Sequence, residues 1–336
     1  MDAMKLPAKQ FYPTKNSLEG CPKNSILVGH DSSVAKFTSI QKAISSLPDD
    51  DTAFIIVVLS GNYTEQLNVT RKAPITIIGQ TLAPNINASF TGSGPTGFPV
   101  PVGTPFGNTD SRVYNINFRN IATEIGAGHL WRSGYQDTVY VGKLGNAYFY
   151  GNEIAGQTDF LYKFGTAWLE RSNLTLRRCG GGIIAWLGTN TTFANQPWNA
   201  QNRSVYFNTS MDASVLESRY TKWSNNPLTN NYNNYTMMGE YGSYGPGFNL
   251  TARLAGNVTI ELDKKTARKY LHPRDVFITH EGKPNVKWID PGYLLSPTPR
   301  GVPGRYSELD KQILSRIDKI NVKLCWIELS ENKPNV

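Results

Sequence analysis

Short runs of apolar and aromatic residues recur along the middle of this chain, with too few residues between them for helices. From residue 113 to residue 258 the runs are three to five residues long and end at Gly, Asn or Asp. Examples are Val139–Val141, Ala147–Tyr150, Ala167–Leu169, Leu174–Leu176 and Ile183–Trp186. Crossover connections between parallel strands need about a dozen residues or more when they contain a helix, so a doubly wound fold is excluded. Strands this short and evenly spaced predict a solenoid, a sandwich or a barrel.

Among these all-β folds, the spacing favours a parallel β-helix. A sandwich has longer strands joined by hairpins, with turn signals about every 8–12 residues, and only some of the gaps fit. Phe37–Leu47 carries apolar residues at helical spacing ahead of strands expected at Phe54–Leu59 and Pro74–Gly79. Gly61–Glu65 reads as a turn into a further strand. A helix before the first strands would cap the solenoid end, which otherwise exposes unpaired backbone groups.

The two ends of the chain differ in composition from this central part. We expect an N-terminal extension over residues 1–35 and one β-helix domain over residues 36–295. Pro, Arg and Gly predominate from Leu295, and Ser307–Ile320 carries one apolar stripe at helical spacing. Residues 296–336 are therefore expected to form a linker and a C-terminal helix. The loop Gly92–Pro101 matches GxGxxG by chance, because its prolines exclude the helix of a dinucleotide site.

Charge and composition narrow the classes of partner and cofactor. The formal net charge of +8 favours an acidic partner. No dense Lys/Arg cluster with interleaved aromatic residues is present, so nucleic acid is not expected. No stretch of 18 apolar residues exists, so no segment is expected to span a membrane. The three cysteines could form one disulfide, and the four histidines lack metal-ligand spacing, so we expect neither a metal nor another cofactor.

Ten N-glycosylation sequons indicate secretion to the extracellular space or cell wall. In a chain rich in Asn and Thr, roughly half that number would arise by chance. Residues 1–20 show no apolar signal core, so the expected location rests on the sequons alone. The sequons begin at Asn62, Asn68, Asn87, Asn173, Asn190, Asn202, Asn208, Asn234, Asn249 and Asn257.

Two aspartates in similar settings stand 22 residues apart in the strand-rich region. Asp137 lies in Gly134–Thr138 and Asp159 in Gln157–Tyr162. This spacing is about one coil of a parallel β-helix, which would place the two residues on adjacent coils about 5 Å apart. Carboxylates that close cannot both ionise freely, so one becomes an acid while the other stays an anion. Taken singly, each could instead be a turn residue that binds backbone amides.

The blocks around these aspartates resemble those of the pectin methylesterases, in the family's order. The matching blocks are Gly61–Glu65, Gly134–Thr138, Gly156–Phe160 and Pro197–Trp198, followed by Met238–Tyr241 and Gly245–Gly247. The resemblance is to the fungal-type branch and extends from about Phe37 to Leu294. It implies an all-β, right-handed parallel β-helix of the pectin-lyase-like kind, with a substrate groove along one face. It also implies a secreted protein, expected to be a monomer, that acts on methyl-esterified homogalacturonan (pectin).

The resemblance further implies roles for the matched residues. Asp159 would attack the methyl-ester carbonyl of a galacturonate unit, giving an acyl-enzyme and methanol. Asp137 would protonate the leaving methoxide and then activate water. Gln136 would donate a hydrogen bond to the oxyanion. Trp198 would stack on a sugar ring. The other aromatic candidates for lining the groove are Tyr135, Phe160 and Tyr162.

Three positions depart from the family pattern. The run 121–133 contains no glutamine, although family members carry a second oxyanion donor on a strand before the first aspartate block. Gln196 stands where the family has an arginine that pairs with the nucleophile, and Lys163 replaces a glycine. Loss of one oxyanion donor costs on the order of 10²–10³ in rate.

These departures keep a second hypothesis open, in which a catalytically impaired pectinesterase-like protein binds acidic cell-wall polysaccharide. A β-helix lyase or glycosidase fits less well. A lyase would require a calcium-binding carboxylate cluster with a basic residue, and a glycosidase would require a different carboxylate pair.

Overall fold

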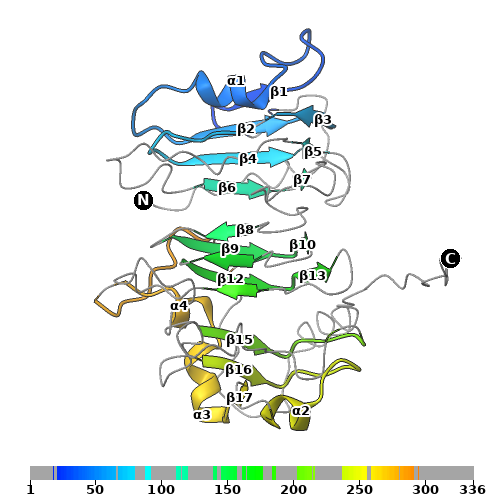
Figure 1. The fold of residues 1–336 in the computed structure, drawn as a ribbon. Helices are drawn as coiled ribbons and strands as arrows, with labels where there is room; N and C mark the ends of the chain where they lie inside the picture. The colour runs from blue at the N-terminus through cyan, green and yellow to red at the C-terminus, as the bar shows by residue number, and fades with distance from the viewer. Residues whose placement is uncertain are drawn as a thin grey trace, which may run out of the picture. The chain divides into compact units, whose positions relative to one another are not determined.

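The structure is a computed structural model of the 336-residue chain. The residues it describes are 18, 21–65, 67–79, 88–91, 111–114, 116–119, 139–141, 145–156, 161–163, 165–176, 184–186, 203–213, 215, 237–255, 259–279, 281–290 and 294. The chain divides into two compact units, one of Met1–Tyr140 with His272–Pro299 and one of Val141–Leu271 with Arg300–Val336. Both consist mainly of short strands (Figure 1).

The first unit contains two parallel sheets that the chain visits in turn. Its strands are β1 (Ile26–Val28), β2 (Phe54–Val58), β3 (Gly61–Thr64), β4 (Ile75–Gly79), β5 (Ala88–Thr91), β6 (Ser111–Tyr114) and β7 (Asn117–Arg119). One sheet has the order β1–β2–β4–β6 and the other β3–β5–β7, and every pair is parallel. From β2 onwards successive strands alternate between the two sheets. Each pair of neighbouring strands from β2 to β7 is therefore connected through a strand of the other sheet.

The second unit repeats this parallel pairing. Strand β8 contains the boundary between the two units, which falls after Tyr140, and is described with the second unit. The strands are β8 (Val139–Val141), β9 (Asn146–Tyr150), β10 (Glu153–Gly156), β11 (Leu161–Lys163), β12 (Thr166–Glu170), β13 (Asn173–Leu176), β14 (Ile184–Trp186), β15 (Arg203–Phe207), β16 (Met237–Tyr241) and β17 (Thr259–Glu261). The sheets are β9–β12, β10–β13, β8–β11–β14 and β15–β16–β17. Asn152 N–H donates to Ser172 Oγ, 20 residues further along, which is the same separation as between the paired residues Asn146 and Thr166. The short strands expected in this region are confirmed.

Strands β2 and β4 are buried on both faces, which explains their continuous apolar sequences. Ile56 and Val58 of β2 belong to one buried cluster, and Ile55 and Val57 belong to another on the opposite face. Parallel strands covered on both sides lose the alternation of polar and apolar residues. Full burial of each such side chain contributes about 1.5–3 kcal/mol. The strands expected at Phe54–Leu59 and Pro74–Gly79 are confirmed.

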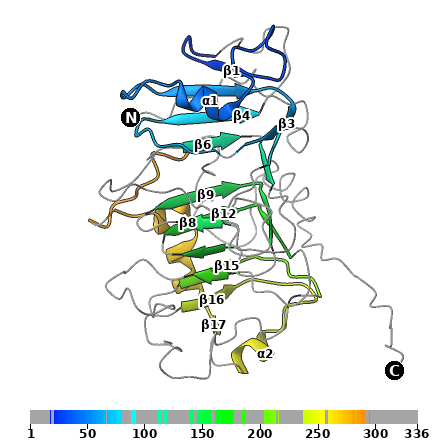
Figure 2. The ribbon, with the colours of Figure 1, turned by 45° about the horizontal axis from the view of Figure 1, so that its top comes forward.

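The expected N-terminal helix is present but shorter than its apolar pattern. Helix α1 covers Ile40–Ser45 and begins after Ser39, whose side chain accepts the Lys42 N–H. Phe37 forms a parallel bridge with Val28 instead. The buried face of α1 contacts β1 and β2 (Figure 2). Strand β1 lies in the segment expected to be an N-terminal extension, where no strand is predicted, and it pairs in register with β2. Gly61–Thr64 forms the strand β3, whereas the sequence predicts a turn over Gly61–Glu65.

The remaining helices are short. They are α2 (Leu250–Ala255), α3 (Lys264–Ala267), the 3-10 helix η2 (Arg268–Tyr270) and α4 (Pro273–Val276). None of the helices described is long and apolar enough to cross a membrane. The predicted loop Gly92–Pro101 and the predicted helix Ser307–Ile320 lie outside the described residues.

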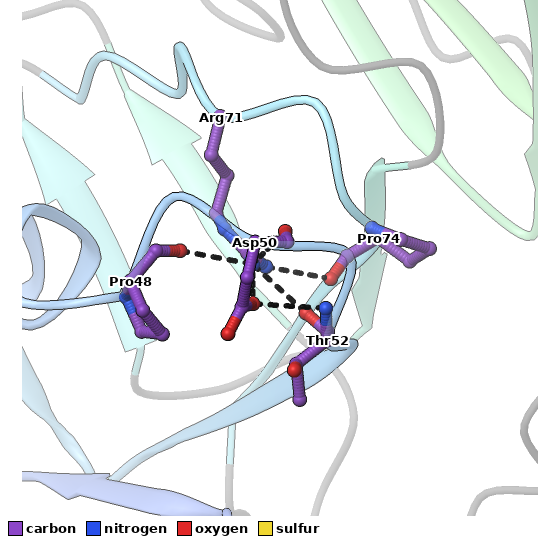
Figure 3. A network of polar contacts seen from close by, with 5 residues as sticks. All are labelled: Pro48, Asp50, Thr52, Arg71 and Pro74. Carbon is purple, nitrogen blue, oxygen red and sulfur yellow. Dashed lines mark hydrogen bonds and ion pairs between the residues drawn. The ribbon is translucent and has the colours of Figure 1, made fainter.

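A buried arginine holds together the loops that precede β2 and β4 (Figure 3). Arg71 Nη2 donates to the carbonyl oxygens of Pro48, Asp50 and Thr52 at 3.2, 3.1 and 2.8 Å. Its Nη1 donates to Pro74 O at 3.2 Å. The side chain is only 7% exposed. The guanidinium group of Arg71 therefore donates hydrogen bonds to backbone carbonyls of both loops at the same time.

We expect Arg71→Lys to lower the free energy of unfolding by about 2 kcal/mol. One ammonium group cannot reach all four carbonyl oxygens, and each buried acceptor left without a donor costs about 1–3 kcal/mol. Urea denaturation followed by circular dichroism measures the change. Arg274→Lys, at an exposed position of α4 in the same unit, is the matched control and should shift stability by less than about 0.5 kcal/mol. Equal stability of the two variants would contradict the role given to Arg71.

Candidate active site

Most residues with predicted catalytic or binding roles lie outside the part of the chain that the structure describes. They are Tyr135, Gln136, Asp137, Asp159, Phe160 and Trp198. Tyr162 lies in β11, where its backbone pairs in register with Ala185 of β14. The separation of the two carboxyl groups therefore stays a prediction. The same holds for Gln196, which also lies outside the described residues.

The strands that follow the two aspartates in sequence are neighbours in one sheet. Strand β8 begins two residues after Asp137, and β11 begins two residues after Asp159. The order of this sheet is β14–β11–β8, and Gly165 N–H donates to Val141 O at 3.0 Å. Val141 and Leu161 are 5% and 2% exposed, so core packing holds both strands in place. Adjacent strands lie about 4.8 Å apart, which is the spacing that the paired-carboxylate hypothesis requires.

Strands β9 and β12, which follow β8 and β11 along the chain, carry a polar aromatic cluster. Tyr148 OH and Trp168 Nε1 both donate to Glu170 Oε2, at 3.0 and 3.3 Å. Trp168 pairs in register with Tyr148, so the two rings come from adjacent strands. Burial, followed by the nearby Glu170 carboxylate, raises the pKa of the Tyr148 phenol, which therefore stays a donor at neutral pH. The sequence does not predict this cluster, because short aromatic runs indicate strands and not which side chains meet across them.

The block Gly61–Glu65 has a structural role in the N-terminal unit. The Glu65 carboxylate accepts hydrogen bonds from Ser39 Oγ at 2.8 Å, Ile40 N–H at 3.0 Å and Gln41 N–H at 2.8 Å. These amides belong to the first turn of α1, where backbone N–H groups have no partner within the helix. A negative charge there is also favoured by the helix dipole. Glu65 therefore fastens the end of β3 to the start of α1.

Replacing Glu65 by alanine should lower the unfolding free energy by about 2 kcal/mol. The change leaves the amides of the first helical turn without their acceptor. A buried donor without a partner costs about 1–3 kcal/mol of stability, and the cost is smaller where water can replace the acceptor. Thermal and urea denaturation measure this loss. Glu281→Ala is the control, because that carboxylate is 68% exposed and its ion pair with Lys283 lies at the surface. A Glu65 variant as stable as the control would contradict this role for Glu65.

Residues of the two late family blocks, Met238–Tyr241 and Gly245–Gly247, contact a buried ion pair. Arg253 of α2 and Glu240 of β16 form an ion pair with side chains 0% and 1% exposed. Ser243 Oγ donates to the other carboxylate oxygen at 2.6 Å, and Arg253 Nη2 donates to Gly247 O at 3.0 Å. A Cβ at Gly247 would lie 1.9 Å from a backbone oxygen, so glycine is required there. These contacts connect α2 to β16 and give the late blocks a structural role.

Within the described part of the chain, no cluster of three or more His, Cys, Asp or Glu residues could hold a metal ion. The carboxylates that do have dense contacts, Glu65, Glu170 and Glu240, each accept protein donors instead.

Comparison with solved structures identifies the class of fold. The pectin methylesterase of Aspergillus niger aligns with a TM-score of 0.63 at 18% identity, covering 82% of this chain and 99% of that one. The pectin methylesterase of Erwinia chrysanthemi aligns with a TM-score of 0.57 at 22% identity, covering 75% and 96%. The chain therefore has the fold of these enzymes.

Comparison with curated sequences points to one family within that fold. A putative pectinesterase/pectinesterase inhibitor 22 of Arabidopsis thaliana is 25% identical over 73% of this chain, and the match covers 54% of that protein. The putative pectinesterase 11 of the same plant is 24% identical, covering 76% of this chain and 78% of that protein. A probable pectinesterase A of Aspergillus flavus is 24% identical over 49% of this chain. No protein-family model matches the chain. The curated matches confirm the resemblance to pectinesterases that the sequence blocks indicate.

Proposed function

We propose that this protein is a pectinesterase that hydrolyses the methyl esters of galacturonate units in pectin, releasing methanol. The observation that carries the proposal is that both aspartate blocks lead directly into neighbouring strands of one sheet. Similarity to pectinesterases over about three quarters of the chain supports the substrate class. Two solved pectin methylesterases with this fold, at TM-scores of 0.54 and 0.52, are complexes with hexasaccharides.

The proposed architecture is a right-handed parallel β-helix with its groove beside β8, β11 and β14. The alternation of successive strands between parallel sheets supports this coiling in the first unit. Pairing of Asn146 with Thr166 and of Glu153 with Asn173 supports coils of similar length in the second. In such a fold, residues at equivalent places on successive coils form rows, so two short motifs can build one site.

In the proposed reaction, one aspartate is the nucleophile and the other moves the proton. A carboxylate oxygen of Asp159 attacks the ester carbonyl carbon, and Gln136 donates a hydrogen bond to the developing oxyanion. The bond to the methoxy oxygen breaks, and Asp137 gives that oxygen a proton, so methanol leaves. Asp137 then takes a proton from water, which attacks the acyl-enzyme. This step releases the galacturonate and restores the Asp159 carboxylate. No cofactor is needed.

The proposed substrate lies along aromatic side chains. Trp198 would stack on one sugar ring, and Tyr135, Phe160 and Tyr162 would line the rest of the groove. The net charge of +8 favours a polymer that gains a carboxylate at each turnover. The excess of sequons supports secretion to the extracellular space or cell wall, where pectin is found.

A second candidate function is binding of acidic cell-wall polysaccharide without turnover. It is favoured by Gln196 at the expected arginine position and by the lack of glutamine in the run 121–133. Without the arginine, less positive charge is available to keep Asp159 ionised beside Asp137.

Methanol release from highly esterified pectin separates these functions. The proposed esterase should release methanol above the level of an Asp159→Ala control at equal protein concentration. Retention on de-esterified pectin with no methanol above that control would favour the binding function. An unsaturated product absorbing in the near ultraviolet would instead indicate a lyase.

A further inference from the structure

Four exposed cations of the second unit lie close together on one short helical segment. Helix α3 and the 3-10 helix η2 continue without a break from Lys264 to Tyr270, and α3 begins three residues after β17 ends (Figure 1). No acidic residue occurs in this segment. Its exposed cations, called the α3 surface below, are Lys264, Lys265, Arg268 and Lys269.

We propose that the α3 surface is a docking site for de-esterified galacturonan, in addition to the groove proposed beside β8, β11 and β14. The inference rests on the proposed function, because the reaction turns a neutral methyl-ester polymer into a polyanion with a carboxylate on each converted unit. It assigns the binding of that product to particular side chains, whereas the net charge of the chain only favours an acidic partner.

The helical spacing brings the four cations together. Arg268 N–H donates to Lys264 O, so these two residues lie one turn apart on the same side of the segment. Lys265 and Lys269 have the same spacing in the sequence. Ala267, by contrast, is only 1% exposed. The segment therefore has one side packed against the protein and another side that presents positive charge to solvent.

No carboxylate neutralises these charges within the part of the chain that the structure describes. None of the four side chains forms an ion pair there. Asp263, the acidic residue nearest in sequence, accepts the Thr266 N–H at 2.6 Å as the N-cap of α3. Hydrogen bonds to Thr266 are the main cause of the lowered pKa of Asp263, and the charge of Lys269 contributes least. The Asp263 carboxylate is thus used by the backbone of the helix.

This arrangement is unfavourable for the isolated helix. Like charges four residues apart repel each other, and the segment contains two such pairs. Elsewhere the described chain provides partners for its cations: Arg253 pairs with Glu240, and even the exposed Lys283 pairs with Glu281 at 2.9 Å. A bound polyanion would supply the counter-charges that the protein does not place beside the α3 surface.

A hydrated acidic polysaccharide fits this surface better than a membrane or a nucleic acid. A helix that lies on a membrane inserts an apolar face into the lipid, whereas Ala267 on the inner side of this segment is already buried in the protein. Single-stranded nucleic acid is held by aromatic rings as well as by cations, and Tyr270, the aromatic residue of the segment, is only partly exposed. Individual exposed ion pairs are weak, so useful affinity requires several carboxylates on one polymer chain.

The proposed docking depends on how far the reaction has proceeded. Highly esterified pectin carries few carboxylates, so the α3 surface should contribute little to its first turnovers. Stretches that have lost their methyl esters should bind, which would hold the enzyme on polymer that it has already converted. The surface should therefore affect retention on the product and leave the initial rate on esterified pectin unchanged.

Binding to polygalacturonate by two variants of equal net charge tests the inference. In the first, all four cations of the α3 surface are changed: Lys264→Gln, Lys265→Gln, Arg268→Gln and Lys269→Gln. The matched control changes four exposed lysines of the first unit: Lys23→Gln, Lys36→Gln, Lys42→Gln and Lys287→Gln. Each variant removes four cations, which lowers the formal net charge from +8 to +4.

We expect the α3-surface variant to bind immobilised polygalacturonate about ten-fold or more weakly at low salt. The control should lose less than about half of that effect on a logarithmic scale, because only the overall charge has changed. The difference between the two variants should disappear at about 1 M salt, where the screening length is about 3 Å. Equal thermal unfolding midpoints would show that both variants are folded.

Three results would overturn the inference. Equal losses in the two variants would mean that net charge alone attracts the polymer, and no loss in either would mean that the polymer binds elsewhere. Tighter α3-dependent binding to phosphatidylserine vesicles or to single-stranded DNA than to polygalacturonate would assign the surface to another partner. Methanol release from esterified pectin is measured in parallel. Release without any effect of the α3 surface on binding would refute the docking site and leave the esterase, whereas α3-dependent binding without methanol release would refute turnover and leave the docking site.

Discussion

Changing Asp159 to asparagine should abolish methanol release from esterified pectin. An amide oxygen is a poor nucleophile and cannot form the acyl-enzyme, so only background hydrolysis remains. Loss of the nucleophile in an enzyme of this kind lowers the rate by on the order of 10⁴-fold or more. Asparagine has nearly the shape of aspartate, so the fold and the polysaccharide contacts should be retained. A coupled assay for methanol at saturating pectin measures the effect.

The controls must separate lost chemistry from lost folding. Asp51→Asn makes the same chemical change at an exposed position and should leave the rate unchanged. The thermal unfolding midpoint of the Asp159 variant should equal that of the unmodified protein. Turnover retained by folded Asp159→Asn would remove this residue as the nucleophile. It would leave the polysaccharide-binding candidate untouched.

The strands were predictable where the sequence carries their physical signature. Strands β2 and β4 have continuous apolar runs because both of their faces are buried. The strand β1 has only three apolar residues within a polar segment, so no periodicity marks it. Helix α1 starts later than its apolar pattern, because Ser39 and Glu65 bind its first amides and fix the first turn.

The burial of three charged side chains could not be predicted from the sequence. No sequence pattern marks Arg71, Arg253 or Glu240 as buried, and charged side chains are almost never fully buried unless they are paired. Their partners are backbone carbonyls or side chains that the fold brings together, and sequence spacing does not encode such contacts. The family blocks marked Gly61–Glu65 correctly as important, but only the contacts of Glu65 identify it as a structural anchor. The assignment of the reaction to the two aspartate blocks rests on their spacing and on the family resemblance.

The second large effect concerns the buried pair of Arg253 and Glu240. We expect Arg253→Met to lower the unfolding free energy by about 3–5 kcal/mol, because it leaves a carboxylate buried without its counter-charge. The variant also loses the hydrogen bond to Gly247 O and the contact of the guanidinium with the Phe248 ring, 4.7 Å from its centroid. Urea denaturation measures the loss. Arg268→Met, at an exposed position, should change stability by less than about 0.5 kcal/mol.

A double variant distinguishes the charge from the packing. Glu240→Gln combined with Arg253→Met removes both charges and keeps most of the side-chain volume. Replacement of a whole buried ion pair by less polar groups is often close to neutral, whereas removal of one partner is not. The double variant should therefore be more stable than Arg253→Met alone, by about 1–3 kcal/mol of coupling. Additive losses in the two single variants would mean that packing around Met211 and Phe248 holds this end of the β-sheet, and that the ion pair adds little.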